Sequence, residues 1–146
     1  MAADAAWGRA QYEAWMSGNE NDLRNYLDPN VVWHAVGATP DSYNGIDSVL
    51  NYIGRAFRMA RIGGEFDIKP SNVVSGDLHG EVDVVDNVIA HGNYLIGLHT
   101  AISTRGVESL ADRTLLVGRV GENGLVTEVW QFFEDVGATQ DFYLGG

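Results

Sequence analysis

"NYLIGLHTAIST", residues 93–104, decides the fold class of this chain. Its apolar, β-branched and aromatic residues follow a period of two, which is typical of a β-strand. Three further segments share this composition and period: 81–91, 113–120 and 125–135. Residues typical of hairpin turns separate them, at His91-Gly92-Asn93 and at 121–124. The second half of the chain is therefore predicted to form successive β-strands.

The first half of the chain shows helical periodicity instead, with apolar residues every three to four positions. Its expected elements are helices over about 3–17, 20–27 and 45–61, a turn at 28–30 and a strand at 31–36. Gly63-Gly64 is expected to end the third helix, and we interpret about 65–80 as an irregular strand or loop. Helices followed by strands predict the α+β class, and a single domain is expected to span residues 1–146.

The composition excludes several classes of function. The formal net charge is −11, with only nine Lys and Arg in 146 residues, so we expect neither a nucleic-acid partner nor an anionic membrane surface. The chain contains no cysteine, which excludes disulfides and thiolate chemistry. It also lacks an apolar run of about 18 residues and a signal-peptide pattern. A cytoplasmic protein is expected.

Three pieces of the chain, in this order, resemble one protein superfamily. They are "YEAWMSGNENDLRNYLDPNVVWHAVG" (12–37), "YNGIDSVLNYI" (43–53) and "GLVTEVWQFFEDVGATQDFY" (124–143). The resemblance is to the nuclear-transport-factor-2-like superfamily, and within it to the SnoaL-like polyketide cyclases and the relatives of ketosteroid isomerase. It implies a cone-shaped, curved mixed β-sheet, with three helices from the N-terminal half closing a deep apolar pocket. It also implies a small hydrophobic molecule as ligand and a homodimer.

The same resemblance suggests which residues carry chemistry. The position of the isomerase general base falls on His34. That of its oxyanion tyrosine falls near Tyr12, or on Gln11 if no gap is allowed. The position of its protonated aspartate falls on Leu116, so the isomerase site is not reproduced. SnoaL-like cyclases use an aspartate on the strand before the last hairpin, where Asp112 is the acidic residue here. We therefore expect His34, Tyr12 and Asp112 as catalytic candidates.

A second histidine, His99, lies in the strand at 93–104. Alternation places it on the same face as Gly97 and Ala101, small residues that leave space beside an imidazole. An imidazole in a pocket can act as a general acid or base near neutral pH. The alternative is that His34 and His99 only satisfy hydrogen bonds in the core or lie at its rim. The histidine spacing gives no metal-binding pattern, so no metal is expected.

Aromatic residues suit a flat hydrophobic ligand, although in a small α+β domain they more often form the core than a binding site. The expected ligand-binding residues are Trp15, Trp33, Tyr52, Trp130 and Phe132. Trp130 is expected nearest to the ligand. Alternation leaves open whether Trp130 and Phe132, or Gln131 and Phe133, point inward.

These observations predict a SnoaL-like small-molecule enzyme. It would use acid/base catalysis without a cofactor, as an isomerase, cyclase or lyase on a hydrophobic carbonyl or polyketide-like substrate. The alternative is a domain that binds a hydrophobic ligand, or assists another protein as a dimer, without catalysis. A weaker alternative is a protein-interaction role.

Overall fold

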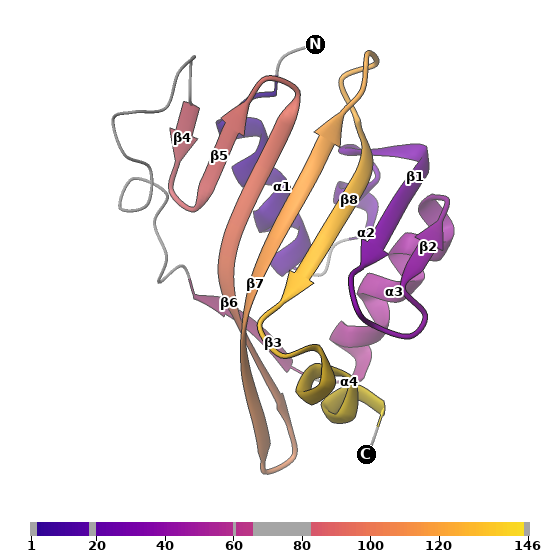
Figure 1. The fold of residues 1–146 in the computed structure, drawn as a ribbon, viewed down its shortest axis with the longest axis vertical. Helices are drawn as coiled ribbons and strands as arrows, with labels where there is room; N and C mark the ends of the chain where they lie inside the picture. Colours follow the sequence, from indigo (N-terminus) through magenta and orange to yellow (C-terminus); the bar gives the residue numbers. More distant parts are fainter. Residues whose placement is uncertain (1–2, 18–19, 60, 66–82, 145–146) are drawn as a thin grey trace.

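The structure is a computed structural model that describes residues 3–17, 20–59, 61–65 and 83–144. Eight strands form one sheet in the order β2-β1-β8-β7-β6-β5-β4, and β3 pairs with β6 beside this path (Figure 1). The strands are β1 Leu27–Ala35, β2 Ser42–Asn44, β3 Arg61–Glu65, β4 Asp83–Val85, β5 Val88–His91, β6 Tyr94–Arg105, β7 Glu108–Val120 and β8 Val126–Phe133. The helices are α1 Ala5–Met16, α2 Glu20–Leu23, α3 Ile46–Met59 and α4 Val136–Leu144.

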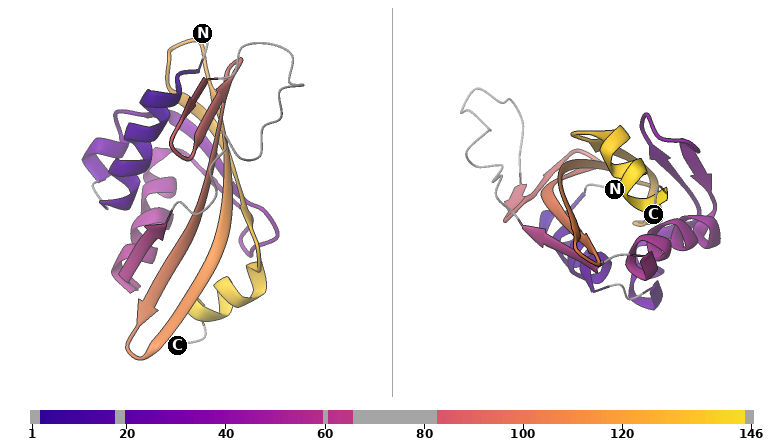
Figure 2. Two further views of the ribbon diagram at one scale, coloured as in Figure 1. Left: turned by 90° about the vertical axis from the view of Figure 1, so that its left-hand side faces the viewer. Right: turned by 90° about the horizontal axis from the view of Figure 1, so that it is seen from below.

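The sheet is mixed and curved. The β1–β8 pair is parallel, whereas β7 pairs antiparallel with both β6 and β8. Figure 2 shows the sheet curving round α1 and α3, while α4 lies at the lower end of the molecule. The predicted α+β class and the cone of curved sheet closed by three helices from the N-terminal half are therefore confirmed. Within the described residues, no helix has the length and apolar character needed to cross a membrane.

The core lies between the inner face of the sheet and the helices. Leu27 and Leu50 are among its most completely buried members, each at most 2% exposed. Burying a side chain of this size stabilises the fold by about 1.5–3 kcal/mol. Along β6, Leu95, Gly97 and His99 are all buried and share one face of the strand. This face is directed toward α1, since Tyr12 of α1 contacts both Gly97 and His99.

Two aspartates accept hydrogen bonds from N–H groups at the start of α1. The Asp4 side chain accepts a hydrogen bond from the backbone N–H of Trp7, 2.8 Å away, and so caps the first turn. The Asp83 carboxylate on β4 accepts a second one from the N–H of Ala5, at 3.0 Å. Both satisfy N–H groups that a helix cannot pair internally. The Asp83 contact also joins the start of α1 to β4.

The order of elements follows the sequence prediction, but several boundaries differ. Residues 28–30, expected as a turn, lie within β1, where the pairing with β8 shifts register between Leu27 and Val32. Pro29 has no N–H to donate, and an irregular part of a strand tolerates this loss. The segment 81–91 was expected as one strand, and its described part, 83–91, is a hairpin of β4 and β5 in which Asp86 adopts a φ of 51°.

Three elements were not predicted: β2, β3 and α4. Gly63 and Gly64 do not cap α3, because α3 ends at Met59 and both glycines pair with β6 as part of β3. Tertiary pairing thus overrides the tendency of glycine to end a helix. The prediction for about 65–80 falls almost entirely outside the described residues.

Candidate functional site

An apolar cavity lies between α1 and the inner face of the sheet. Its volume is about 50 Å³, and its wall includes Tyr12, Trp15, Trp33, Gly97, Leu116 and Val129. Ligand pockets usually span about 300–1,000 Å³. The cavity therefore suits a small compound, and anything larger requires side chains in the wall to move.

Tyr12 and His99 form a buried polar pair at this wall. The Tyr12 hydroxyl lies 2.9 Å from Nδ1 of His99, and the edge of the Trp15 ring meets the same imidazole at a centroid distance of 4.9 Å. Gly97 makes this arrangement possible. A Cβ atom at Gly97 would lie 2.3 Å from the Tyr12 hydroxyl oxygen, so a larger residue would displace the phenol. The space that the sequence predicted beside His99 is filled by Tyr12.

Burial keeps both members of the pair uncharged. His99 is fully buried, and burial lowers its pKa to about 4. Burial raises the pKa of the Tyr12 hydroxyl well above its ordinary value of 10, although nearby Arg9 partly opposes this shift. Near neutral pH the site is therefore a neutral phenol beside a neutral imidazole.

The second imidazole nitrogen indicates where the proton lies. Nε2 of His99 is buried and has no hydrogen-bond partner among the described residues. In the protein backbone, a buried N–H without a partner is rarer than a buried carbonyl oxygen without one, and we apply the same preference to this imidazole. We therefore assign the proton to Nδ1, so that His99 donates to the Tyr12 oxygen. This tautomer directs the hydroxyl proton of Tyr12 away from His99.

Gln131 is a polar residue of the inner face that the sequence prediction did not choose. It is 7% exposed, and its Oε1 accepts hydrogen bonds from Trp33 Nε1 at 3.0 Å and from the Tyr52 hydroxyl at 2.8 Å. It pairs directly with Leu116 on β7. Alternation along β8 had left open whether Gln131 or its neighbours point inward. The sequence signal for Gln131 was its place as a polar residue between two aromatic residues.

Asp112 also lies on the inner face of the sheet, but its carboxylate contacts the segment before α4. It pairs with Ala101 and is 5% exposed. One carboxylate oxygen accepts from the backbone N–H of Asp135 at 3.1 Å, and the other lies 3.4 Å from the Thr114 hydroxyl. Burial raises the pKa of the Asp112 carboxyl. The carboxylate thus holds the residue before α4, and it does not border the cavity.

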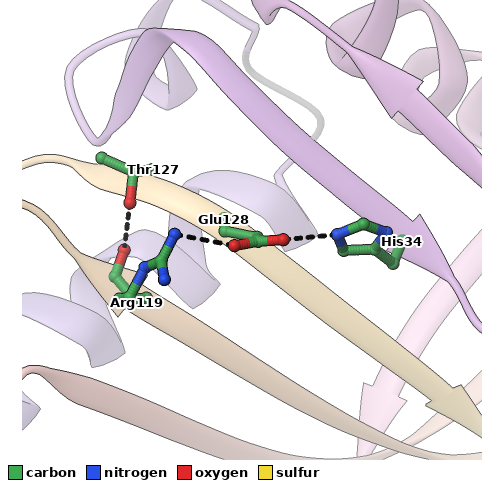
Figure 3. A network of polar contacts seen from close by, with 4 residues as sticks. All are labelled: His34, Arg119, Thr127 and Glu128. Carbon is green, nitrogen blue, oxygen red and sulfur yellow. Dashed lines mark hydrogen bonds and ion pairs between the residues drawn. The ribbon is translucent and has the colours of Figure 1, made fainter.

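His34 lies on the opposite face of the sheet from the cavity. Its neighbour Trp33 takes the inward position, so alternation turns the imidazole outward. Nε2 of His34 lies 2.6 Å from a Glu128 oxygen, and the other Glu128 oxygen lies 2.7 Å from Arg119 (Figure 3). The Trp130 ring stacks on His34 at a centroid distance of 5.6 Å. The prediction that His34 faces the pocket is wrong.

The expected ligand-binding aromatics divide between the two faces. Trp15 and Trp33 border the cavity, and Tyr52 reaches the inner face through its bond to Gln131. Trp130 lies beside His34 on the outer face, and Phe132 is 38% exposed. The placement of Trp130 next to the ligand is therefore wrong, because Val129 and Gln131 occupy the inward positions of β8. Among the described residues, no cluster of His, Asp or Glu could hold a metal ion.

Several solved structures share this fold. Bal32a, from a soil-derived mobile gene cassette, is 21% identical over 92% of each chain, with a TM-score of 0.66. An LEH-like epoxide hydrolase of M. tuberculosis is 15% identical over 97% of this chain and 90% of its own, also with a TM-score of 0.66. An NTF2-like protein of Burkholderia xenovorans LB400 is 13% identical over 86% and 84%, with a TM-score of 0.60.

Sequence comparison identifies the family. A search of curated protein sequences finds no significant match. The SnoaL-like domain, by contrast, matches residues 9–134, which include the larger part of α1, the strands from β1 to β8 and both members of the Tyr12–His99 pair. This match covers far more than half of the 146 residues. The chain belongs to the SnoaL-like domain family.

Proposed function

We propose that this protein is a cofactor-independent enzyme acting on a small hydrophobic carbonyl compound in the cavity. The observation that carries the proposal is the hydrogen bond between Tyr12 and His99 at a largely apolar wall. Tyr12 donates its proton to the carbonyl oxygen, and Nδ1–H of His99 donates to the Tyr12 oxygen. The hydrogen bond from His99 makes the Tyr12 hydroxyl a stronger donor, because hydrogen bonds in a chain polarise one another.

The pair is suited to a step in which negative charge develops on the carbonyl oxygen. When the bond between hydrogen and the adjacent carbon breaks, its electron pair moves toward oxygen and an enolate forms. A donor already oriented at a largely apolar cavity wall stabilises this charge without reorganisation. Removing one such donor typically lowers kcat by about 10²–10³-fold. Isomerisation, cyclisation and carbon–carbon cleavage all pass through an enolate of this kind.

The cavity wall also restricts which substrates can react. Among the described residues that border the cavity, Tyr12 is the ionisable one, and neither an imidazole nor a carboxylate is present to remove a proton from carbon. The proton must then leave to water or to a group of the substrate. This requirement favours a substrate whose C–H bond is already acidified by conjugation or by a second carbonyl group, as in polyketide-like compounds.

Exchange of solvent deuterium tests this proposal without knowledge of the natural substrate. Single-ring ketones are incubated with the protein in D₂O, and loss of the proton signal next to the carbonyl is followed by NMR. We expect the wild type to accelerate exchange for at least one ketone, and Tyr12→Phe to reduce that acceleration by about 10²-fold or more. Tyr94→Phe, at a residue that is 41% exposed, is the matched control. No acceleration by the wild type would overturn the proposal.

One alternative is favoured by a specific observation. The small cavity and the absence of an acid or base other than Tyr12 among its described lining residues also suit a domain that binds a ligand without converting it. The same experiment separates the two functions. Saturable binding of a ketone without accelerated exchange would support binding alone.

A further inference from the structure

A band of apolar side chains crosses the outer face of the sheet, opposite the cavity. In one row Ile96 on β6 pairs with Val117 on β7, and Val117 pairs with Trp130 on β8. In the next row Leu115 on β7 pairs with Phe132 on β8. These side chains point outward, because the residues next to them along the strands lie on the cavity face. The helices α1 and α3 lie on the concave side of the sheet (Figure 2), so they do not cover this outer apolar band.

Each end of the band carries one cation and one anion on the same two strands. At one end Arg119 on β7 pairs with Glu128 on β8, and an Arg119 nitrogen lies 2.7 Å from a Glu128 oxygen. At the other end Arg113 on β7 lies beside Glu134, the residue that follows β8, whose carboxylate accepts from the Arg113 N–H at 3.2 Å. The outward positions of β7 thus read arginine, two aliphatic residues, arginine. Those of β8 and its continuation read glutamate, two aromatic residues, glutamate.

This pattern is complementary to itself. A two-fold axis that runs along the strands, between β7 and β8, lays β7 of each copy over β8 of the other. Each aromatic side chain of β8 then meets an aliphatic side chain of β7, and each arginine position meets a glutamate position. A two-fold axis across the strands would instead place arginine opposite arginine. Opposite charges facing each other favour one register of association and like charges exclude the other.

The charge of the chain points to the same face. With a formal net charge of −11, two copies repel each other as whole molecules. The outer apolar band contains no carboxylate, and Glu128 at its end is held between Arg119 and His34, with Nε2 of His34 at 2.6 Å. Two copies can therefore approach here without bringing uncompensated acidic side chains together. Contiguous exposed apolar surface of this kind marks an interaction site.

We propose that two copies of this chain form a two-fold homodimer through the outer apolar band. Trp130 and Phe132 lie at the centre of the interface, and contacts between Arg119 of one copy and Glu128 of the other lie at its rim. Closed two-fold pairs are the commonest protein assemblies, and both copies use the same surface in them. The inference does not depend on the function proposed above, because the band and the cavity lie on opposite faces of the sheet.

Sedimentation equilibrium tests the proposal. We expect the wild type to have about twice the 15.9 kDa mass of one chain, and Phe132→Glu, which puts a charge at the centre of the interface, to be a monomer. Val84→Glu is the matched control. Val84 lies on the same outer face and is 37% exposed, against 38% for Phe132. It lies on β4, three strands from β7, whereas only two strands lie beyond β8, so no strand of the other copy covers it.

Two charge reversals test the axis and do not depend on the folding of Phe132→Glu. Glu128→Arg brings arginine opposite arginine across the axis, and Arg119→Glu brings glutamate opposite glutamate. We expect each variant alone to dimerise about tenfold or more weakly than the wild type. An equimolar mixture should recover the dimer, because each arginine then faces a glutamate of the other chain. Asp47→Arg, which reverses the 2.9 Å ion pair of Asp47 with Arg24 outside the band, is the control.

A wild type that remains at the mass of one chain would overturn the proposal. A folded Phe132→Glu that still dimerises, or a mixture of the two charge variants that does not recover the dimer, would do the same. Loss of the dimer in Val84→Glu or Asp47→Arg would also overturn it, because added or reversed charge away from the band would then have the same effect.

Discussion

The Tyr12 hydroxyl oxygen lies 2.9 Å from Nδ1 of His99, although 87 positions separate the two residues in the sequence. This contact joins α1 to the middle of β6 and places a polar group at the wall of an apolar cavity. It depends on Gly97, two residues before His99, because the phenol occupies the volume that a side chain at Gly97 would fill. Stability, cavity shape and the proposed chemistry therefore depend on the same few atoms.

The first prediction concerns the contribution of this bond to stability. Tyr12→Phe removes the hydroxyl and leaves the His99 Nδ1 group buried without that partner, which should lower the free energy of unfolding by about 1–3 kcal/mol. Urea denaturation measures the change. Tyr94→Phe should stay within about 0.5 kcal/mol of the wild type, as expected for an exposed position. Equal effects of the two substitutions would contradict a specific role for the bond.

The second prediction compares two glycines that both border the cavity. A Cβ atom at Gly97 would lie 2.2 Å from the Tyr12 ring, whereas a Cβ atom at Gly118 would meet Val126 at an ordinary 3.6 Å. Gly97→Ala should therefore destabilise the protein by about 1–3 kcal/mol through overpacking. It should also slow the deuterium exchange of the ketone, because the added methyl group displaces Tyr12. Gly118→Ala should leave stability nearly unchanged. A tolerated Gly97→Ala would mean that Tyr12 does not rest on β6 as described.

The third prediction follows from the buried imidazole. Burial lowers the pKa of His99 to about 4 from an ordinary value of 6.5. The unfolded chain therefore binds a proton between these pH values while the folded chain does not, so stability is complete above pH 6.5 and falls as the pH drops toward 4. The shift corresponds to about 3 kcal/mol. Denaturation curves for the wild type and His99→Gln between pH 7 and 4 should show a shallower decline in the variant. Parallel declines would contradict the prediction.

Much of the fold could be predicted from sequence because it depends on local periodicity. The period of two in 93–104 and 113–120 identified the central strands β6 and β7, and the apolar repeat in 45–61 identified α3. The predictions that failed concern residues whose structure depends on pairing with strands distant in the sequence. Gly63 and Gly64 have no strand character of their own, and they become strand because β6 pairs with them.

The candidate site divides in the same way. The sequence indicated that His99 shares a face with small residues, and the structure brings Tyr12 to that face. It could not indicate whether Trp33 or His34 faces inward, because alternation fixes only that the two point to opposite sides. The larger apolar indole took the inward position. Gln131 was likewise undetermined until the register of β8 was known.

The fourth prediction concerns Asp112 and has the opposite sign from that of His99. Burial raises the pKa of the Asp112 carboxyl, so the fold favours the protonated form. The contribution of this group to stability is therefore largest at acidic pH and declines as the pH rises through the raised pKa. Asp112→Asn keeps an oxygen that can accept from the Asp135 N–H and removes the buried charge. The variant should gain melting temperature over the wild type at pH 7 and lose that advantage near pH 3.5, whereas Asp41→Asn, at an exposed residue, should not.

The last prediction concerns His34, whose imidazole lies outside the cavity. His34→Ala removes a partly exposed contact with Glu128 and the stacking on Trp130. Partly exposed ion pairs contribute about 0–1 kcal/mol, so the loss of stability should be small. Because Trp33 still fills the inward position, the acceleration of ketone deuterium exchange should stay within about twofold of the wild type. A fall of tenfold or more with the fold intact would show that the outer face communicates with the ligand, and would return His34 to the list of functional residues.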